Sequence, residues 1–118
     1  MPIKQWIASE TGAKAEQVAK GYLIDQGLGF ITENFRCKAG EIDLIFKDMQ
    51  QFVFVEVKYR ETDSHGSAAH MFTRAKRRKL ERAIMCYLQA LDLNLHHTSL
   101  RIDLIAIDKQ NINWIQNV

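Results

Sequence analysis

The segments GEIDLI (residues 40–45) and FVFVEVK (residues 52–58) decide the fold of this chain. Both are rich in β-branched and aromatic residues, which is typical of β-strands. Only a short polar segment separates them, so we expect an antiparallel hairpin with strands at 40–47 and 51–59. Each strand nevertheless carries acidic residues near its centre. Charged side chains are rarely buried unless they are paired or bind a metal.

The register of this hairpin places the charged side chains on one face. Side chains alternate between the two faces of a strand. With a turn centred on residues 49–50, the register that pairs apolar with apolar residues sets Asp43 opposite Glu56 and Glu41 opposite Lys58. Directly opposed residues have Cβ atoms about 4.5–5.5 Å apart, so two carboxylates in these positions repel each other.

A divalent cation between the two carboxylates would remove this repulsion. Oxygen-only ligation suits Mg²⁺ or Mn²⁺, and Lys58 lies on the same face, within reach of a phosphate or a water. Two carboxylates, a metal and a lysine are the components of metal-assisted phosphodiester hydrolysis. The alternative is an ordinary Glu41–Lys58 ion pair on a solvated face, with the Asp43–Glu56 pairing incidental. The pattern leaves both interpretations open.

The rest of the chain predicts an α/β protein with one domain over residues 1–118 and the element order α-β-β-β-α-β-β. Apolar residues at helical spacing indicate two helices, and alternating apolar residues indicate three strands outside the hairpin. A polar, glycine-containing loop is expected before the second helix. The predicted helices are 11–26 and 74–91, the strands are 28–36, 99–107 and 111–116, and the loop is 60–73.

The composition indicates an ordinary soluble protein, with 47% hydrophobic and 25% charged residues and a net charge of +2. The first ten residues lack the apolar segment of a signal peptide, and no apolar run reaches the length of a membrane span. A cytoplasmic protein with no membrane association is therefore expected. Two cysteines, Cys37 and Cys86, do not make a disulfide framework, so we expect two reduced thiols with Cys86 in the core.

Positive charges are concentrated in the segment TRAKRRKLER (residues 73–82), at the predicted start of the second helix. The helix dipole disfavours cations there, and bound phosphates would compensate for them. Lys76 extends the inward face of the helix towards the hairpin. The alternative is a solvated basic face that only aids solubility. The candidate nucleic-acid contacts are Lys76, Arg77, Arg78 and Arg74, with Arg60 and Arg36 near the hairpin ends.

The spacing of Asp43 to Glu56-Val57-Lys58 resembles the core motif of the PD-(D/E)XK nuclease superfamily. The match is closer to one branch, the YraN-like family of uncharacterised bacterial proteins, which resembles Holliday-junction resolvases. It covers nearly the whole chain. The supporting blocks are Gly12 to Leu23, Asn34–Arg36, GEIDLI, VFVEVK with Arg60, Lys76, and Arg101–Asp103.

The resemblance implies a restriction-endonuclease-like mixed β-sheet flanked by helices, and metal-dependent hydrolysis of DNA, with branched or damaged DNA as candidate substrates. It implies that Asp43 and Glu56 bind Mg²⁺ or Mn²⁺ and that the Val57 carbonyl is a further ligand. Neighbouring carboxylates favour a charged lysine, so we expect Lys58 to orient the attacking water and stabilise charge rather than to act as a base.

Two further carboxylates are expected beside these ligands. Glu16 resembles the acidic residue of the first helix that completes the site in the superfamily, and its alternative is an exposed carboxylate at the helix edge. Glu41 is expected to support the site through an ion pair with Lys58.

Other functional classes stay open. One is a DNA- or RNA-binding module that has the fold but no independent catalysis, and another is a subunit that becomes active only with a partner. A homodimer would suit a symmetric junction substrate. The intact set of Asp43, Glu56 and Lys58 favours catalysis, because a protein that only binds has no need of opposed carboxylates.

Overall fold

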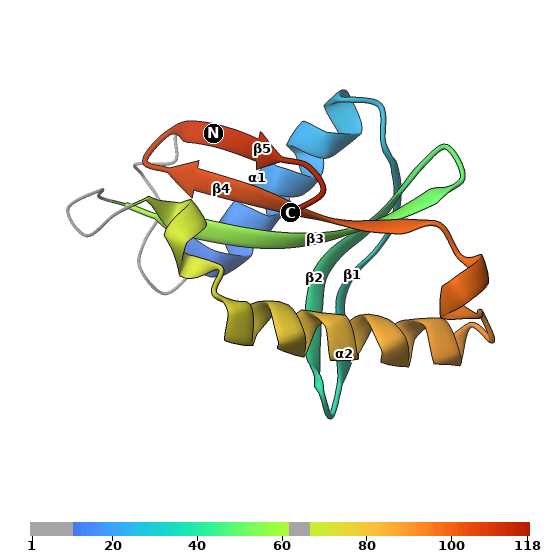
Figure 1. Cartoon of the computed structure of the whole chain (residues 1–118). Coiled ribbons are helices and arrows are strands. Elements are labelled where there is room, and N and C mark those ends of the chain that lie inside the picture. Colours follow the sequence, from blue (N-terminus) through green and yellow to red (C-terminus); the bar gives the residue numbers. More distant parts are fainter. Residues whose placement is uncertain (1–10, 62–66) are drawn as a thin grey trace.

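The computed structural model describes residues 11–61 and 67–118 as a five-stranded mixed sheet with a helix on each face (Figure 1). The α/β class and the predicted order α-β-β-β-α-β-β are confirmed, and they are consistent with a restriction-endonuclease-like fold. The elements are α1 (Thr11–Asp25), β1 (Gly29–Cys37), β2 (Gly40–Asp48), β3 (Gln51–Arg60), α2 (Arg74–Ala90), β4 (Leu100–Asp108) and β5 (Asn111–Ile115).

The predicted loop at 60–73 differs in part from the structure. Strand β3 extends through Arg60, and a short 3₁₀ helix, η3 (Ala68–Met71), precedes α2. Ala68 anchors η3 to the sheet, since its backbone N–H donates to Asp108 Oδ1 at 2.6 Å. The middle of the predicted loop, residues 62–66, lies outside the described residues. None of the helices within the described ranges has the length and apolar character needed to span a bilayer.

The strands lie in the order β1-β2-β3-β4-β5. All neighbours are antiparallel except β3 and β4, which are parallel and are joined by the crossover through α2. The predicted hairpin register is confirmed near the turn, where Ile45 pairs with Phe54. The ladder between β2 and β3 ends at Leu44 and Val55. Asp43 and Glu56 therefore lie just beyond the point where the two strands separate, and the predicted ladder pairing of these two residues is not formed.

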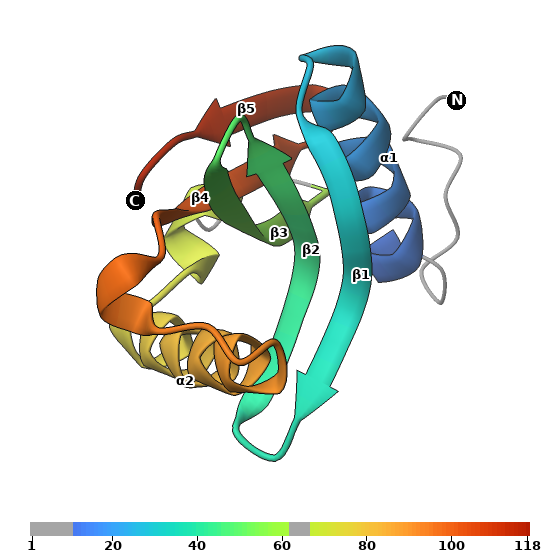
Figure 2. The same cartoon turned by 90° about the vertical axis from the view of Figure 1, so that its right-hand side faces the viewer.

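Each face of the sheet is covered by one helix (Figure 2). Ala15, Ala19 and Leu23 of α1 pack against the valines of β3, and α2 packs its apolar face against Phe54 and its neighbours. Ile42 belongs to the α2 side together with Ile45, although strict alternation predicted that they would lie on opposite faces. The alternation is interrupted here, where Asn34 of the neighbouring strand has a φ of 55°.

A buried polar cluster joins β4 to the hairpin turn and to the C-terminal segment. The Asp103 side chain is fully buried and accepts hydrogen bonds from Trp114 Nε1 at 2.9 Å and from the Asn117 backbone N–H at 2.9 Å. It also pairs with Arg101 Nε at 3.0 Å, and Arg101 Nη1 contacts Asp48 Oδ2 at 3.0 Å. The Arg101–Asp103 block therefore has a structural role, and its side-chain contacts with the hairpin are at the turn, with Asp48 and Gln51.

We expect Asp103→Ala to lower the free energy of unfolding by about 3–5 kcal/mol, because it leaves the buried Arg101 guanidinium without its main partner. Urea unfolding followed by circular dichroism measures this loss. Asp25→Ala removes an exposed carboxylate at the end of α1 and should change the stability by less than about 0.5 kcal/mol. Equal unfolding midpoints for the two variants would contradict the structural role of Asp103.

Candidate functional site

A cavity of about 390 Å³ lies where β2 separates from β3. Its walls come from both helices and both strands, because the gap in the sheet lets side chains from the two layers meet. Figures 1 and 2 show β1 and β2 running past α2, away from β3. The lining residues are Glu16 of α1, Gly40, Glu41 and Asp43 of β2, Glu56, Val57 and Lys58 of β3, and Lys76, Lys79 and Leu80 of α2.

The Asp43 side chain closes the end of the β2–β3 ladder. The residue is only 6% exposed, and its Oδ2 accepts a hydrogen bond from the Val57 backbone N–H at 2.9 Å. Without this bond the Val57 N–H would lack a partner, since the ladder has already ended, and an unsatisfied buried donor is costly. The carboxylate thus has a local structural reason for its place in the strand. The same carboxyl group also forms a side-chain hydrogen bond with Glu56.

Glu56 lies beside Asp43 with its side chain 14% exposed, and the two carboxyl groups influence each other strongly. Burial, together with the hydrogen bond and charge of Asp43, raises the pKa of Glu56 to about 9. Lys58 opposes this shift, with its Nζ 3.7 Å from Glu56 Oε2. The contact predicted between the two acids is therefore present, although they are not ladder partners. The proton on Glu56 removes the repulsion between the two carboxylates, which a bound cation would otherwise have to offset.

Glu16 extends this acidic group from the other layer of the fold. It is half-buried on α1, and its pKa is raised to about 7, first by burial and then by the negative charges of Asp43 and Glu41. Arg36 opposes the shift. Glu16 therefore lines the cavity and is not simply an exposed carboxylate at the helix edge.

Glu41 differs from its prediction. Its side chain is half exposed at the rim of the cavity and pairs with Arg36, with 3.0 Å between Arg36 Nε and Glu41 Oε2. Lys58 pairs with Glu56 instead. The predicted Glu41–Lys58 ion pair is wrong because β2 has left β3 before it reaches Glu41. Arg36, a predicted nucleic-acid contact, consequently lies next to the cavity.

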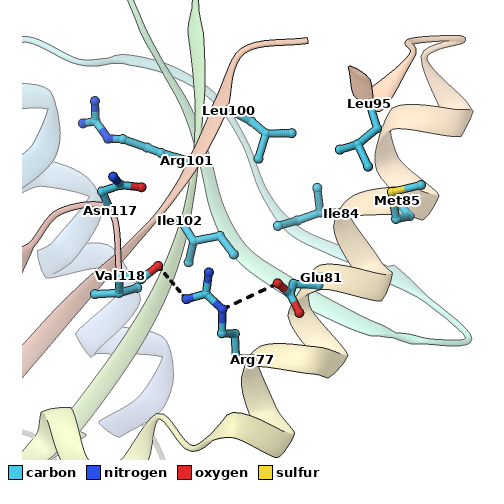
Figure 3. A pocket seen from close by; sticks show the side chains of 10 residues that line it. All are labelled: Arg77, Glu81, Ile84, Met85, Leu95, Leu100, Arg101, Ile102, Asn117 and Val118. Atoms are coloured by element: carbon cyan, nitrogen blue, oxygen red, sulfur yellow. Dashed lines mark hydrogen bonds and ion pairs between the residues drawn. The ribbon is translucent and has the colours of Figure 1, made fainter. Parts of the chain in front are cut away.

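The basic residues of α2 divide between two sides of the helix. Lys76 lines the cavity as predicted. Arg77 lies on the other side, where its Nη1 donates to the Val118 carbonyl at 2.5 Å and its Nε is 3.5 Å from Glu81 (Figure 3). Arg77 contributes there to a separate pocket bordered by β4 and the C-terminal residues, so it is not aimed at the carboxylates.

The remaining predicted basic contacts lie outside the cavity. Arg74 and Arg78 are exposed on α2, and neither is among the lining residues. Arg60 stands at the far end of β3 and does not line it either. These three arginines reach a ligand in the cavity only if that ligand extends across the surface.

Three lining residues were not among the predicted site residues: Gly40, Lys79 and the apolar Leu80. Lys79 lies three positions after Lys76, a spacing that brings side chains to the same side of a helix and could have identified it. Gly40 allows β2 to approach α2 closely: it has a φ of 156°, and a Cβ at this position would lie 3.4 Å from the Lys79 carbonyl oxygen. No local sequence signal marks such a contact between distant segments.

The donor set suits a hard divalent cation better than zinc. Asp43 and Glu56 offer carboxylate oxygens, and Val57 offers a carbonyl. Mg²⁺ commonly binds through one or two carboxylates, with water and substrate phosphate as the other ligands. Over residues 11–61 and 67–118, no three His, Cys, Asp or Glu side chains are arranged to hold a metal by themselves. A cation at this site would therefore need oxygen ligands from water or substrate.

Comparison with known proteins identifies the family. The model of uncharacterised protein family UPF0102 matches residues 15–107. A UPF0102 protein of Vibrio campbellii is 48% identical over 110 residues, which cover 92% of this chain and 90% of that protein. A UPF0102 protein of Aliivibrio fischeri is 49% identical over 104 residues, with coverages of 86% and 85%. The chain therefore belongs to the uncharacterised protein family UPF0102, the YraN-like family that its GEIDLI and FVEVK blocks resemble.

Proposed function

We propose that this protein is a metal-dependent nuclease-like enzyme that hydrolyses phosphodiester bonds in DNA. The observation that carries this proposal is the adjacent pair of the buried Asp43 and the largely buried Glu56, with the Lys58 ammonium 3.7 Å from Glu56 in an open cavity. Two acids in this position destabilise each other as anions, so the site favours a bound cation. A structural ion pair alone would not require the second carboxylate.

The side chains have distinct roles in this proposal. Asp43, Glu56 and the Val57 carbonyl would hold Mg²⁺ or Mn²⁺, which supplies a Lewis acid for a phosphoryl oxygen. Lys58 orients the attacking water and stabilises negative charge at the phosphate. Glu16 faces the same space from α1 and helps to position water at the site.

The substrate side of the cavity is basic. Lys76 and Lys79 of α2 line the same cavity as the acids, and exposed arginines continue the positive charge along α2. A DNA backbone is a polyanion that such a surface binds through its phosphates. Branched or damaged DNA is the substrate form suggested by the resemblance to resolvases.

A nucleic-acid-binding module without catalysis is the second candidate. One observation favours it: Asp43 Oδ2 is already engaged by the Val57 N–H, so one of its two oxygens has a structural use. In that case Asp43 would close the end of the strand ladder, and the lysines alone would account for binding.

Cleavage assays test the proposed reaction. Single-stranded, duplex, flap and four-way-junction DNA, with matching RNA strands, are incubated with the protein and Mg²⁺ or Mn²⁺. We expect wild-type cleavage of at least one DNA substrate and a loss of roughly 100-fold or more in Asp43→Asn and Lys58→Gln. The Asp43→Asn amide oxygen can still accept the Val57 N–H, so this variant should fold. Asp25→Asn, distant from the cavity, should retain full activity.

Two outcomes would reject catalysis at this site. Metal-dependent cleavage that survives both substitutions would point to a contaminating nuclease. Binding to all substrates without cleavage by the wild type would support the nucleic-acid-binding module instead.

The raised pKa of Glu56 predicts how the metal-free stability depends on pH. The ordinary pKa of Glu56 is 4.5, and its pKa in the folded protein is about 9. The stabilisation from its protonated form is therefore fully present below pH 4.5 and is lost as the pH rises through about 9. We expect Glu56→Gln, which stays neutral, to lose less thermal stability than the wild type over this pH range. Melting curves recorded with a chelator measure the difference.

Cation binding supplies the second part of this test. Mg²⁺ should raise the melting temperature of the wild type most at the alkaline end of the range, where both acids ionise, and should have little effect on Glu56→Gln. If the melting temperatures of the two proteins change in parallel with pH, both with and without Mg²⁺, then Glu56 neither titrates as described nor binds the ion.

The division of charge on α2 predicts different effects for two matched double variants. Lys76→Gln with Lys79→Gln should weaken DNA binding and reduce the slope of log K against log[salt] by about 2, because two phosphate contacts are lost. Arg78→Gln with Arg82→Gln removes the same charge from exposed positions and should change the slope less. Fluorescence anisotropy over a salt series measures both. Equal slopes for the two variants would contradict a specific role of Lys76 and Lys79 in DNA binding.

A further inference from the structure

The two cysteines of the chain are distant in sequence but adjacent in the fold. Cys37 ends β1 and Cys86 lies on α2, and the Cys86 thiol hydrogen-bonds to the Cys37 sulfur. Both residues are half-buried, so Cys86 is not the core residue that the sequence predicted. Neither is in a disulfide, and both retain access to solvent.

The packing around the thiols holds them together. An edge-to-face ring contact joins Phe35, two residues before Cys37, to Tyr87, the residue after Cys86, with centroids 5.2 Å apart. Cys37 itself packs against the apolar cluster of α2. On the other side of the hairpin bend, Gly40 pairs with Cys37 and approaches the Lys79 backbone. The end of the β1–β2 hairpin is thus seated along α2.

The two sulfurs have different environments. The hydrogen bond from Cys86 lowers the pKa of Cys37, and the backbone N–H groups of Ala39 and Gly40 lower it further against the opposing effect of burial. The pKa of Cys86 is raised, first because its thiol donates to Cys37 and then by burial. A stabilised, accessible thiolate beside a second thiol is the usual arrangement of a redox-responsive pair.

We propose that Cys37 and Cys86 form a reversible intramolecular disulfide on exposure to a hydroperoxide. The Cys37 thiolate attacks the terminal peroxide oxygen, the O–O bond breaks, and Cys37 becomes a sulfenic acid while the peroxide leaves as water or an alcohol. Cys86 then loses its proton and attacks the Cys37 sulfur, which forms the S–S bond and releases the sulfenic oxygen as water. The two thiols together give two electrons to the peroxide.

The disulfide would connect two walls of the acidic cavity. The hairpin end carries Gly40 and Glu41, and α2 carries Lys76 and Lys79. A covalent link between β1 and α2 would hold these walls at a fixed separation, whether or not the cavity cleaves DNA.

Oxidation of the purified chain tests the proposal. The wild type, Cys37→Ser and Cys86→Ser are treated with stoichiometric hydrogen peroxide at low protein concentration, and thiol titration, intact mass and peptide mapping follow the products. We expect the wild type to lose two hydrogen atoms and both thiols in a Cys37–Cys86 linkage that dithiothreitol reverses. Cys86→Ser should stop at a sulfenic acid that dimedone traps, and Cys37→Ser should react more slowly.

Thermal unfolding gives an independent readout. The oxidised wild type should melt roughly 10 °C or more above the reduced protein, because the bridge closes a long loop, and neither variant should show this rise. Exclusively intermolecular disulfides, or equal peroxide reactivity of the two single variants, would overturn the proposal. So would an oxidised monomer whose melting temperature is unchanged.

Discussion

The hydrogen bond from the Val57 backbone to Asp43 is the constraint on which the rest of the site depends. Strand β2 leaves β3 after Leu44, and the Asp43 carboxylate replaces the missing backbone partner at 2.9 Å. This places a buried acid next to Glu56, and burial of the two together raises the pKa of Glu56 to about 9. The same bond that ends the ladder therefore creates a site where positive charge is favoured.

The two helices complete the cavity, and α2 supplies positive charge to it. Because the sheet is open at this point, Glu16 from α1 and two lysines from α2 reach the same space from opposite faces. The polar cluster of Arg101 and Asp103 ties the hairpin turn to β4 and to the C-terminal segment, and neither residue lines the cavity. Helix α2 separates these functions, with Lys76 on the cavity side and Arg77 bound to the C-terminal carbonyl.

The correct and incorrect predictions at this site have one physical origin. Pairing of apolar residues near the turn specified the register of Ile45 with Phe54, and the structure confirms it. Extending that register to Glu41 and Lys58 failed, because strands twist and separate where no apolar pair holds them. Asp43 and Glu56 remain in contact because they lie directly beside the last paired residues.

The sequence by itself determined the element order, the apolar faces of both helices, the hairpin register near its turn and the family. These depend on local periodicity and on short motifs, which are readable without knowledge of distant contacts. Only the tertiary structure decided that Lys79 and not Arg77 lines the cavity, that Glu41 pairs with Arg36, and that Cys37 meets Cys86. The Glu41–Arg36 pair depends on where β2 leaves β3, and the other two depend on how α2 lies against β1 and β2. That placement follows from packing between segments some forty residues apart, for which no single stretch of sequence carries a signal.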